Sequence, residues 1–107
     1  MITAIIRRNK AGRIAGFDIT NHGKKEVCAA VSALAINAVN SIETLTSAPF
    51  ACDYDPAGGY LHFELPRASR GETDPKADLL LESMLLGLVS VQENYQGYIN
   101  ILDEPTD

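Results

Sequence analysis

The feature that most restricts the fold of this chain is a long apolar segment with helical periodicity, from Glu26 to Thr46. Its apolar residues recur at spacings of three and four, which places them on one face of an α-helix. These residues are Val27, Val31, Leu34, Ala35, Ala38, Val39, Ile42 and Leu45. A helix with one apolar face must bury that face against other elements of the fold, so the rest of the chain has to supply a broad apolar surface.

Several other segments have the β-branched content or the alternation of apolar and polar residues that is typical of β-strands. They are residues 2–8, 13–20, 50–54, 60–65 and 98–102. Turn-forming residues separate the first two segments at 9–12, and the next two at 55–59, so each pair is predicted to form a hairpin. Residues 67–75 are predicted to form a polar loop, and residues 103–107 an acidic tail.

A second helix is predicted to begin after Asp74, which can cap it, with Pro75 in the first position. It should run to about Tyr95, and it is apolar around much of its circumference, so both faces meet protein or one face meets a partner subunit. The element order is ββαββαβ. This order predicts an α+β fold with two helices packed on one mixed or antiparallel sheet, forming a single domain over residues 1–107.

Composition excludes several classes of function. The 107 residues carry 9 Lys and Arg against 14 Asp and Glu, and Lys24–Lys25 is the clearest basic pair, which disfavours nucleic-acid binding. The uncharged stretch Val27–Ile42 is shorter than the roughly 20 apolar residues of a membrane span. The N-terminal charges follow an apolar run, the reverse of a signal peptide, so we expect a cytoplasmic protein. The 2 cysteines and 2 histidines lack metal-ligand spacing, and we expect no metal site and no cofactor.

Residues that could carry chemistry gather around the start of the first helix. Cys28 lies in its first turn, where the helix dipole and free backbone N–H groups favour the thiolate. His22 precedes the helix and could accept the thiol proton. The N–H groups of Cys28 and Ala29 could face an oxyanion, and Ser32 lies one turn further along the same side. Together these residues supply the parts needed for acyl transfer.

Two structural alternatives stay open at this level. Cysteine is among the most buried residue types, so Cys28 among alanines could simply be a packing residue. Ser32 could bond a backbone carbonyl within its own helix. Cys52 and His62 form a competing pair on the two strands of the second predicted hairpin, but no helix end activates that thiol. We therefore expect Cys52 and His62 to have structural roles.

The segment Val27-Cys28-Ala29-Ala30-Val31-Ser32-Ala33-Leu34, preceded by a strand and a histidine, resembles the bacterial ribosomal-processing cysteine proteases, the Prp family. The Gly58-Gly59-Tyr60 turn and the Leu79–Leu81 helix, followed by Tyr95 and Tyr98, extend the resemblance over nearly the whole chain. The resemblance implies that Cys28 is the nucleophile and His22 its base. It also implies a cytoplasmic homodimer, with the apolar second helix at its interface, that removes an N-terminal extension from large-subunit ribosomal protein number twenty-seven.

The chain departs from the family pattern just before the nucleophile. Asn21 replaces a glycine, Lys25 stands where the family has an acidic residue, and the segment between His22 and Gly23 is several residues shorter. This segment is either a true deletion or a sign that mobile residues are missing from the sequence, and we favour the second interpretation. Two other functions stay open: a non-catalytic dimeric module that binds a ribosomal protein, and a thiol hydrolase with a small substrate.

Overall fold

The computed structural model describes residues 1–72 and 74–105. Its elements follow in the order β1 (Ile2–Arg8), β2 (Ile14–Thr20), α1 (Lys25–Leu45), β3 (Ala51–Tyr54), β4 (Tyr60–Glu64), α2 (Pro66–Ser69), α3 (Pro75–Asn94) and β5 (Ile99–Pro105). Every predicted strand and helix is present, and the predicted α+β class is confirmed. The largest differences from the prediction are the added helix α2 and the length of β5.

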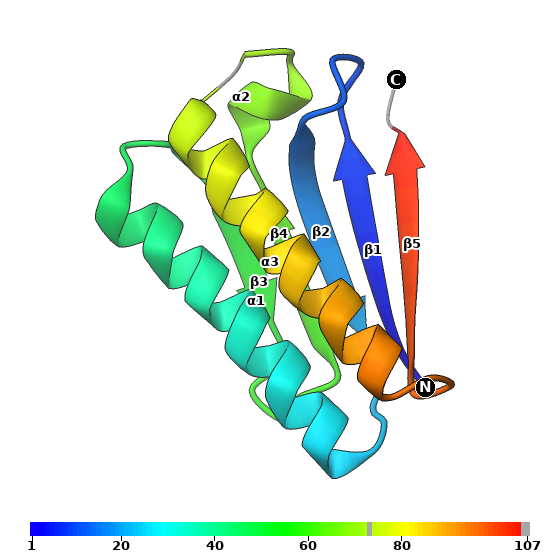
Figure 1. Ribbon diagram of the computed structural model, residues 1–107. Helices are drawn as coiled ribbons and strands as arrows, with labels where there is room; N and C mark the ends of the chain where they lie inside the picture. The colour runs from blue at the N-terminus through cyan, green and yellow to red at the C-terminus, as the bar shows by residue number, and fades with distance from the viewer. Residues whose placement is uncertain (73, 106–107) are drawn as a thin grey trace.

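The five strands form one mixed sheet in the order β3-β4-β2-β1-β5. Both predicted hairpins are antiparallel, and β4 also pairs antiparallel with β2. The last strand, β5, pairs parallel with β1, because α3 carries the chain back to the opposite end of the sheet. Figure 1 shows α1 and α3 side by side on one face of this sheet.

The C-terminal segment that we expected to be an acidic tail is largely part of the sheet. Residues up to Pro105 continue β5, in register with β1 as far as Arg8. The Arg8 guanidinium binds the Asp103 carboxylate, with 3.0 Å between Nε and Oδ1. The expected loop after β4 likewise contains the short helix α2, which begins at Pro66 because proline suits the first helical turn. The last two residues of the predicted tail lie outside the described residues.

The core fills the space between the sheet and the two helices. Val27, Val31, Ala35, Ala38 and Ile42 form the buried face of α1, and Ala77, Leu81, Met84 and Leu88 form that of α3. The helices approach closely at Gly87, where an added Cβ would lie 2.7 Å from the Leu34 Cδ2 atom. Most of the predicted apolar face of the first helix is therefore buried in the core, whereas Leu45 in its last turn is 63% exposed.

Helix α1 is long and apolar enough to cross a membrane by length and composition alone, with 21 residues and a mean hydropathy of 1.3. Core helices of globular proteins pass the same test. In this fold α1 packs on the sheet through its buried face, whereas the side chains of Asn37, Asn40 and Glu43 are exposed. The outer side also exposes the apolar residues Ile36 and Leu45.

Three stacked aromatic rings form the part of the core beside β4. Removing the central ring tests how much this stack contributes to the stability of the fold. Phe63 is completely buried, and its ring centroid lies 5.2 Å from that of Phe17 and 5.5 Å from that of Phe50. We expect Phe63→Ala to lower the free energy of unfolding by about 3–5 kcal/mol, measured by urea denaturation. The matched control is Leu45→Ala at the exposed end of α1, where the side chain is 63% exposed, with an expected change within about 0.5 kcal/mol. Equal losses in the two variants would contradict this description of the core.

Candidate active site

A cleft of about 570 Å³ lies between α1 and the β3–β4 hairpin, at the end of the sheet where β2 leads into α1. Figure 1 shows the β2–α1 connection and the β3–β4 turn at the same end of the molecule. The cleft is lined by both residues of the predicted dyad, Cys28 and His22, and by Ser32. Its opposite wall includes Cys52, Tyr54 and Leu61 from the hairpin, so two distant parts of the sequence build one site.

Cys28 is half-buried in the first turn of α1. Its sulfur contacts the backbone of Gly23, which lies just before the helix. The Gly23 N–H donates to Sγ at 3.3 Å, and Sγ lies 3.6 Å from the Gly23 carbonyl oxygen, to which a protonated thiol can donate. The residue that follows His22 therefore contacts the predicted nucleophile directly. A backbone N–H donor at this place stabilises a thiolate more than a thiol.

His22 lies in the same connection between β2 and α1, immediately before Gly23. It follows Asn21, whose φ of 73° turns the chain sharply at the end of β2, and the Asn21 N–H donates to the Gly59 carbonyl oxygen at 2.9 Å. Within the described residues no hydrogen bond joins the His22 imidazole to the Cys28 sulfur. The structure thus brings the two side chains into one cleft without joining them. Catalytic hydrogen bonds are often long in unliganded sites and tighten once substrate binds.

His22 is followed directly by Gly23 in the full sequence of 107 residues, so no residues are missing between them. Our expectation of missing mobile residues is therefore wrong. The physical consequence is a tight connection of four residues, 21–24, between β2 and α1. It is this tightness that places the Gly23 backbone against the sulfur of Cys28.

A family model described as "Cysteine protease Prp" matches residues 1–100. The chain belongs to this family. Ribosomal processing cysteine protease Prp of Bacillus subtilis is 34% identical, with 94% of this chain and 96% of the relative covered. The protein of the same name from Staphylococcus aureus is 32% identical, with 94% and 97% covered.

Solved structures agree with this family assignment. The crystal structure of an essential ribosomal processing protease Prp from S. aureus, in complex with a covalently linked product peptide, has a TM-score of 0.89. It is 31% identical, and the match covers 97% of this chain and 100% of that chain. A second structure of that protease, with a substrate peptide, has a TM-score of 0.84 at 29% identity and the same coverage. The resemblance inferred from the sequence is confirmed, and the fold is that of a cysteine protease family.

The predicted oxyanion-binding role of the Cys28 and Ala29 backbone is wrong for this arrangement. Helix α1 begins at Lys25, one residue earlier than predicted, so the Cys28 N–H already donates to the Lys24 carbonyl oxygen at 2.9 Å. Ala29 lies one residue deeper, where the helical pattern assigns its N–H to the Lys25 carbonyl oxygen. The N–H groups that the helix leaves free belong to its first three residues, 25–27. Ser32 lines the cleft one turn after Cys28, as predicted, and its supporting role stays a prediction.

The competing pair, Cys52 and His62, is separated by the sheet. Asp53 is the register partner of His62, and Cys52 that of Phe63, so the Cys52 and His62 side chains lie on opposite faces. His62 Nδ1 lies 2.5 Å from Asp18 Oδ1 on the face away from the helices. Arg7 also pairs with the Asp18 carboxylate. Local alternation could not reveal this network, because it joins side chains of three different strands.

Cys52 lies in the same cleft as Cys28, and the two thiols should differ in reactivity. Burial raises the pKa of the Cys52 thiol, and the Asp53 carboxylate raises it further. Because the thiolate is the nucleophile, we expect iodoacetamide to alkylate Cys28 at least about tenfold faster than Cys52 at neutral pH. Peptide mapping by mass spectrometry distinguishes the two sites. Equal rates in the folded protein would argue against an activated Cys28.

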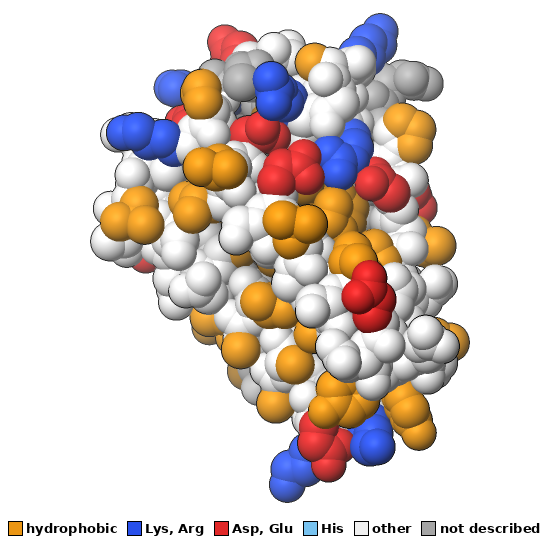
Figure 2. Space-filling model, in the orientation of Figure 1, with side chains coloured by type: hydrophobic (Ala, Val, Ile, Leu, Met, Phe, Trp, Pro, Cys, Tyr) orange, Lys and Arg blue, Asp and Glu red, His pale blue; other side chains and the backbone are white. Residues whose placement is uncertain are grey.

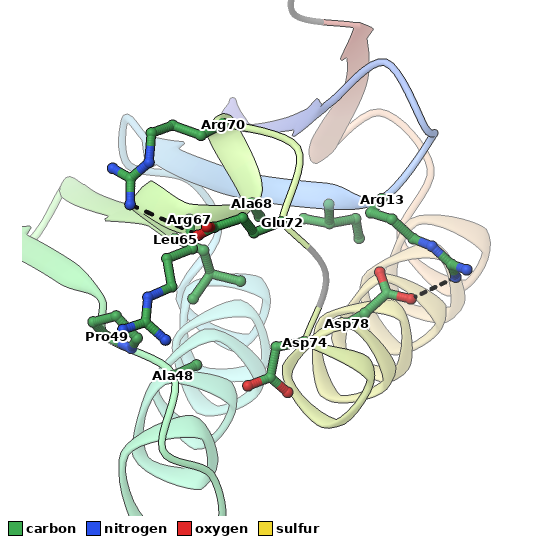
Figure 3. A pocket seen from close by; sticks show the side chains of 11 residues that line it. Arg13, Ala48, Pro49, Leu65, Arg67, Ala68, Arg70, Glu72, Asp74 and Asp78 are labelled. Atoms are coloured by element: carbon green, nitrogen blue, oxygen red, sulfur yellow. Dashed lines mark hydrogen bonds and ion pairs between the residues drawn. The ribbon is translucent and has the colours of Figure 1, made fainter.

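A second cavity, of about 550 Å³, lies near α2 and the start of α3, and none of the predicted site residues lines it. Figure 3 shows its charged side chains largely engaged with each other: Arg13 pairs with Asp78 at 2.9 Å, and Arg70 with Glu72 at 3.8 Å. Within residues 1–72 and 74–105, no group of three or more His, Cys, Asp or Glu could hold a metal ion. The residues predicted to carry acyl transfer therefore lie in the cleft that contains Cys28.

Proposed function

We propose that this protein is a cysteine endopeptidase that processes a ribosomal protein, with Cys28 as the nucleophile and His22 as the general base. One observation carries the proposal: a chain of the cysteine protease Prp family places Cys28 and His22 in the same cleft. The cleft is lined on its other side by apolar and aromatic residues of β3 and β4, which suits an extended peptide.

The reaction follows from these positions. The Cys28 Sγ attacks the scissile carbonyl carbon, while His22 takes the thiol proton and then gives it to the leaving amine. The C–N bond breaks and a thioester to Cys28 remains. His22 next takes a proton from water, the hydroxide attacks the thioester carbon, and the sulfur leaves as the peptide acid is released. The Gly23 N–H, 3.3 Å from Sγ, stabilises the sulfur whenever it carries negative charge.

The proposed substrate is large-subunit ribosomal protein number twenty-seven, from which the enzyme removes a short N-terminal extension. Support comes from the relatives, which are called ribosomal processing proteases, and from the S. aureus complex with a substrate peptide. Charge also supports it: residues 54–107 hold three Lys or Arg against ten Asp or Glu, which attracts a basic substrate. Asp55 brings one of these carboxylates to the lining of the cleft.

The proposal is tested by incubating the protein with the precursor of that ribosomal protein from the same organism, and reading the products by mass spectrometry. We expect a single cut near the N-terminus of the precursor. Binding of the precursor without any cut would favour the non-catalytic assembly module. Cleavage of small thioester or amide substrates, with the precursor left intact, would favour a small-substrate thiol hydrolase.

We also propose that the protein acts in the cytoplasm as a homodimer that contacts itself through α3. Leu79 and Leu86 are 69% and 74% exposed, and they lie two turns apart on one side of this helix. Figure 2 shows apolar side chains spread over the helical face of the molecule. Sedimentation velocity at micromolar concentration tests the dimer, and Leu86→Glu should shift the protein to the monomer if this face is the interface.

A further inference from the structure

We propose that Gly59 is a positioning residue for His22, and that the Gly58–Gly59 turn forms the seat on which the imidazole rests. The inference rests on the proposed role of His22 as general base. It concerns the β3–β4 hairpin, whose residues lie far from His22 and Cys28 in the sequence. In this view the hairpin forms one wall of the cleft and also determines where the base stands.

The first observation is the close approach of the imidazole to the turn. A Cβ added to Gly59 would lie 2.6 Å from His22 Nε2 and 3.0 Å from its Cδ2 atom. A Cβ added to Gly58 would lie 3.3 Å from the His22 Cε1 atom. Distances below 3.0 Å are not found between real Cβ atoms and their neighbours, so any other residue at position 59 must displace the ring. The imidazole therefore packs directly against the backbone of Gly58 and Gly59, which have no side chains.

The second observation is that a backbone hydrogen bond joins the turn to the residue before His22. The Asn21 N–H donates to the Gly59 carbonyl oxygen at 2.9 Å, immediately before His22. The turn is itself fixed by Asp55, whose carbonyl oxygen accepts from the Gly58 N–H at 2.8 Å and whose Oδ1 accepts from the Ala57 N–H at 2.9 Å. These hydrogen bonds fix the position of the Gly58–Gly59 turn relative to the backbone of His22.

The third observation is that His22 is otherwise exposed and lies within the short connection 21–24. An exposed imidazole samples several rotamers unless a neighbouring surface restricts it. General-base catalysis needs the ring within hydrogen-bond reach of the thiol, so restriction of its rotamers has a direct effect on the rate. Gly58 and Gly59 supply this restriction because both lack a side chain at the point of contact.

The test separates the contact from the backbone conformation. Gly59 has a φ of +86°, and any residue with a Cβ is strained there regardless of its neighbours. Gly12 provides the matched control: its φ is +82°, and an added Cβ meets nothing within 4 Å. Gly59→Ala and Gly12→Ala therefore share the backbone strain, whereas only Gly59→Ala collides with His22. Thermal unfolding of both variants verifies that they remain folded.

The measurement is the rate of Cys28 alkylation by iodoacetamide as a function of pH, resolved from Cys52 by peptide mapping. We expect Gly59→Ala to slow alkylation at neutral pH by about tenfold and to give the pH profile of His22→Ala. Gly12→Ala should stay within about twofold of the wild-type protein. The double variant of Gly59→Ala and His22→Ala should react no more slowly than His22→Ala alone, because both changes act through one imidazole.

Three results would overturn the inference: wild-type alkylation in Gly59→Ala, faster alkylation in that variant, or a loss that adds fully to that of His22→Ala. If His22→Ala itself reacts like the wild-type protein, the proposed base is wrong, and this outcome is distinct from a failure of the seat alone. Should Gly59→Ala not fold, Gly58→Ala takes its place. Its added Cβ lies 3.3 Å from the ring, and we expect a smaller loss in the same direction.

Discussion

Replacing Cys28 with alanine is expected to reduce cleavage of the ribosomal precursor to the uncatalysed background, a loss of about 10,000-fold or more in kcat. The thiol is the atom that forms the covalent bond, and no neighbouring group replaces it in the same position. Cys52 lines the cleft, but burial and the Asp53 carboxylate raise its pKa, which lowers its thiolate population. Product masses over a time course, for both proteins at equal concentration, measure the effect.

The fold and the binding site should survive this substitution, which makes the result interpretable. Alanine is the strongest helix former, and Cys28 is only half-buried, so we expect a small change in thermal stability. The precursor should still bind, with an affinity close to that of the wild-type protein. Cys52→Ala serves as the second control and should still cut the precursor. Cleavage by Cys28→Ala, or its loss in Cys52→Ala alone, would place the nucleophile elsewhere.

Local patterns were sufficient for most of the fold. The helical spacing of the segment 26–46 predicts α1 to within one residue at each end, and the turn residues between paired strands predict both hairpins. The end of β5 could not be predicted in this way, because its stability comes from parallel pairing with β1 and from the contact of Arg8 with Asp103, 95 residues apart. Acidic residues at a chain end have the composition of a solvated tail until such a partner is known.

The site shows the same division between local and long-range information. Cys28 and His22 lie six residues apart, and local sequence patterns predict both as site residues, whereas the contact of the imidazole with Gly59 depends on how the β3–β4 hairpin packs. The prediction that the Cys28 N–H is free for an oxyanion failed because the helix begins one residue earlier than predicted. With a start at Glu26 the Cys28 N–H would be free, but with a start at Lys25 it is the first bond of the helix.

Replacing His22 with alanine is expected to lower kcat/KM for the precursor by about 100- to 10,000-fold, the range for loss of a general acid–base group. The nucleophile stays in place and the Gly23 N–H still contacts its sulfur, so a residual activity above background should remain. Added imidazole should restore part of the rate, because removal of an exposed side chain leaves an open space in the cleft beside Gly59. Initial rates at several imidazole concentrations measure both effects.

The chain contains its own control for this substitution, since it has only one other histidine. His62 lies on the face of the sheet away from the helices and binds Asp18, so it takes no part in the cleft between α1 and the hairpin. His62→Ala should keep kcat/KM within about threefold of the wild-type value, because Asp18 retains its ion pair with Arg7 and surface changes of this kind are mild. An equal loss of cleavage in both variants, at unchanged thermal stability, would show that the imidazole of His22 is not the base. A loss confined to His22→Ala, with rescue by imidazole, would assign the proton transfer to the cleft in which Cys28 and His22 meet.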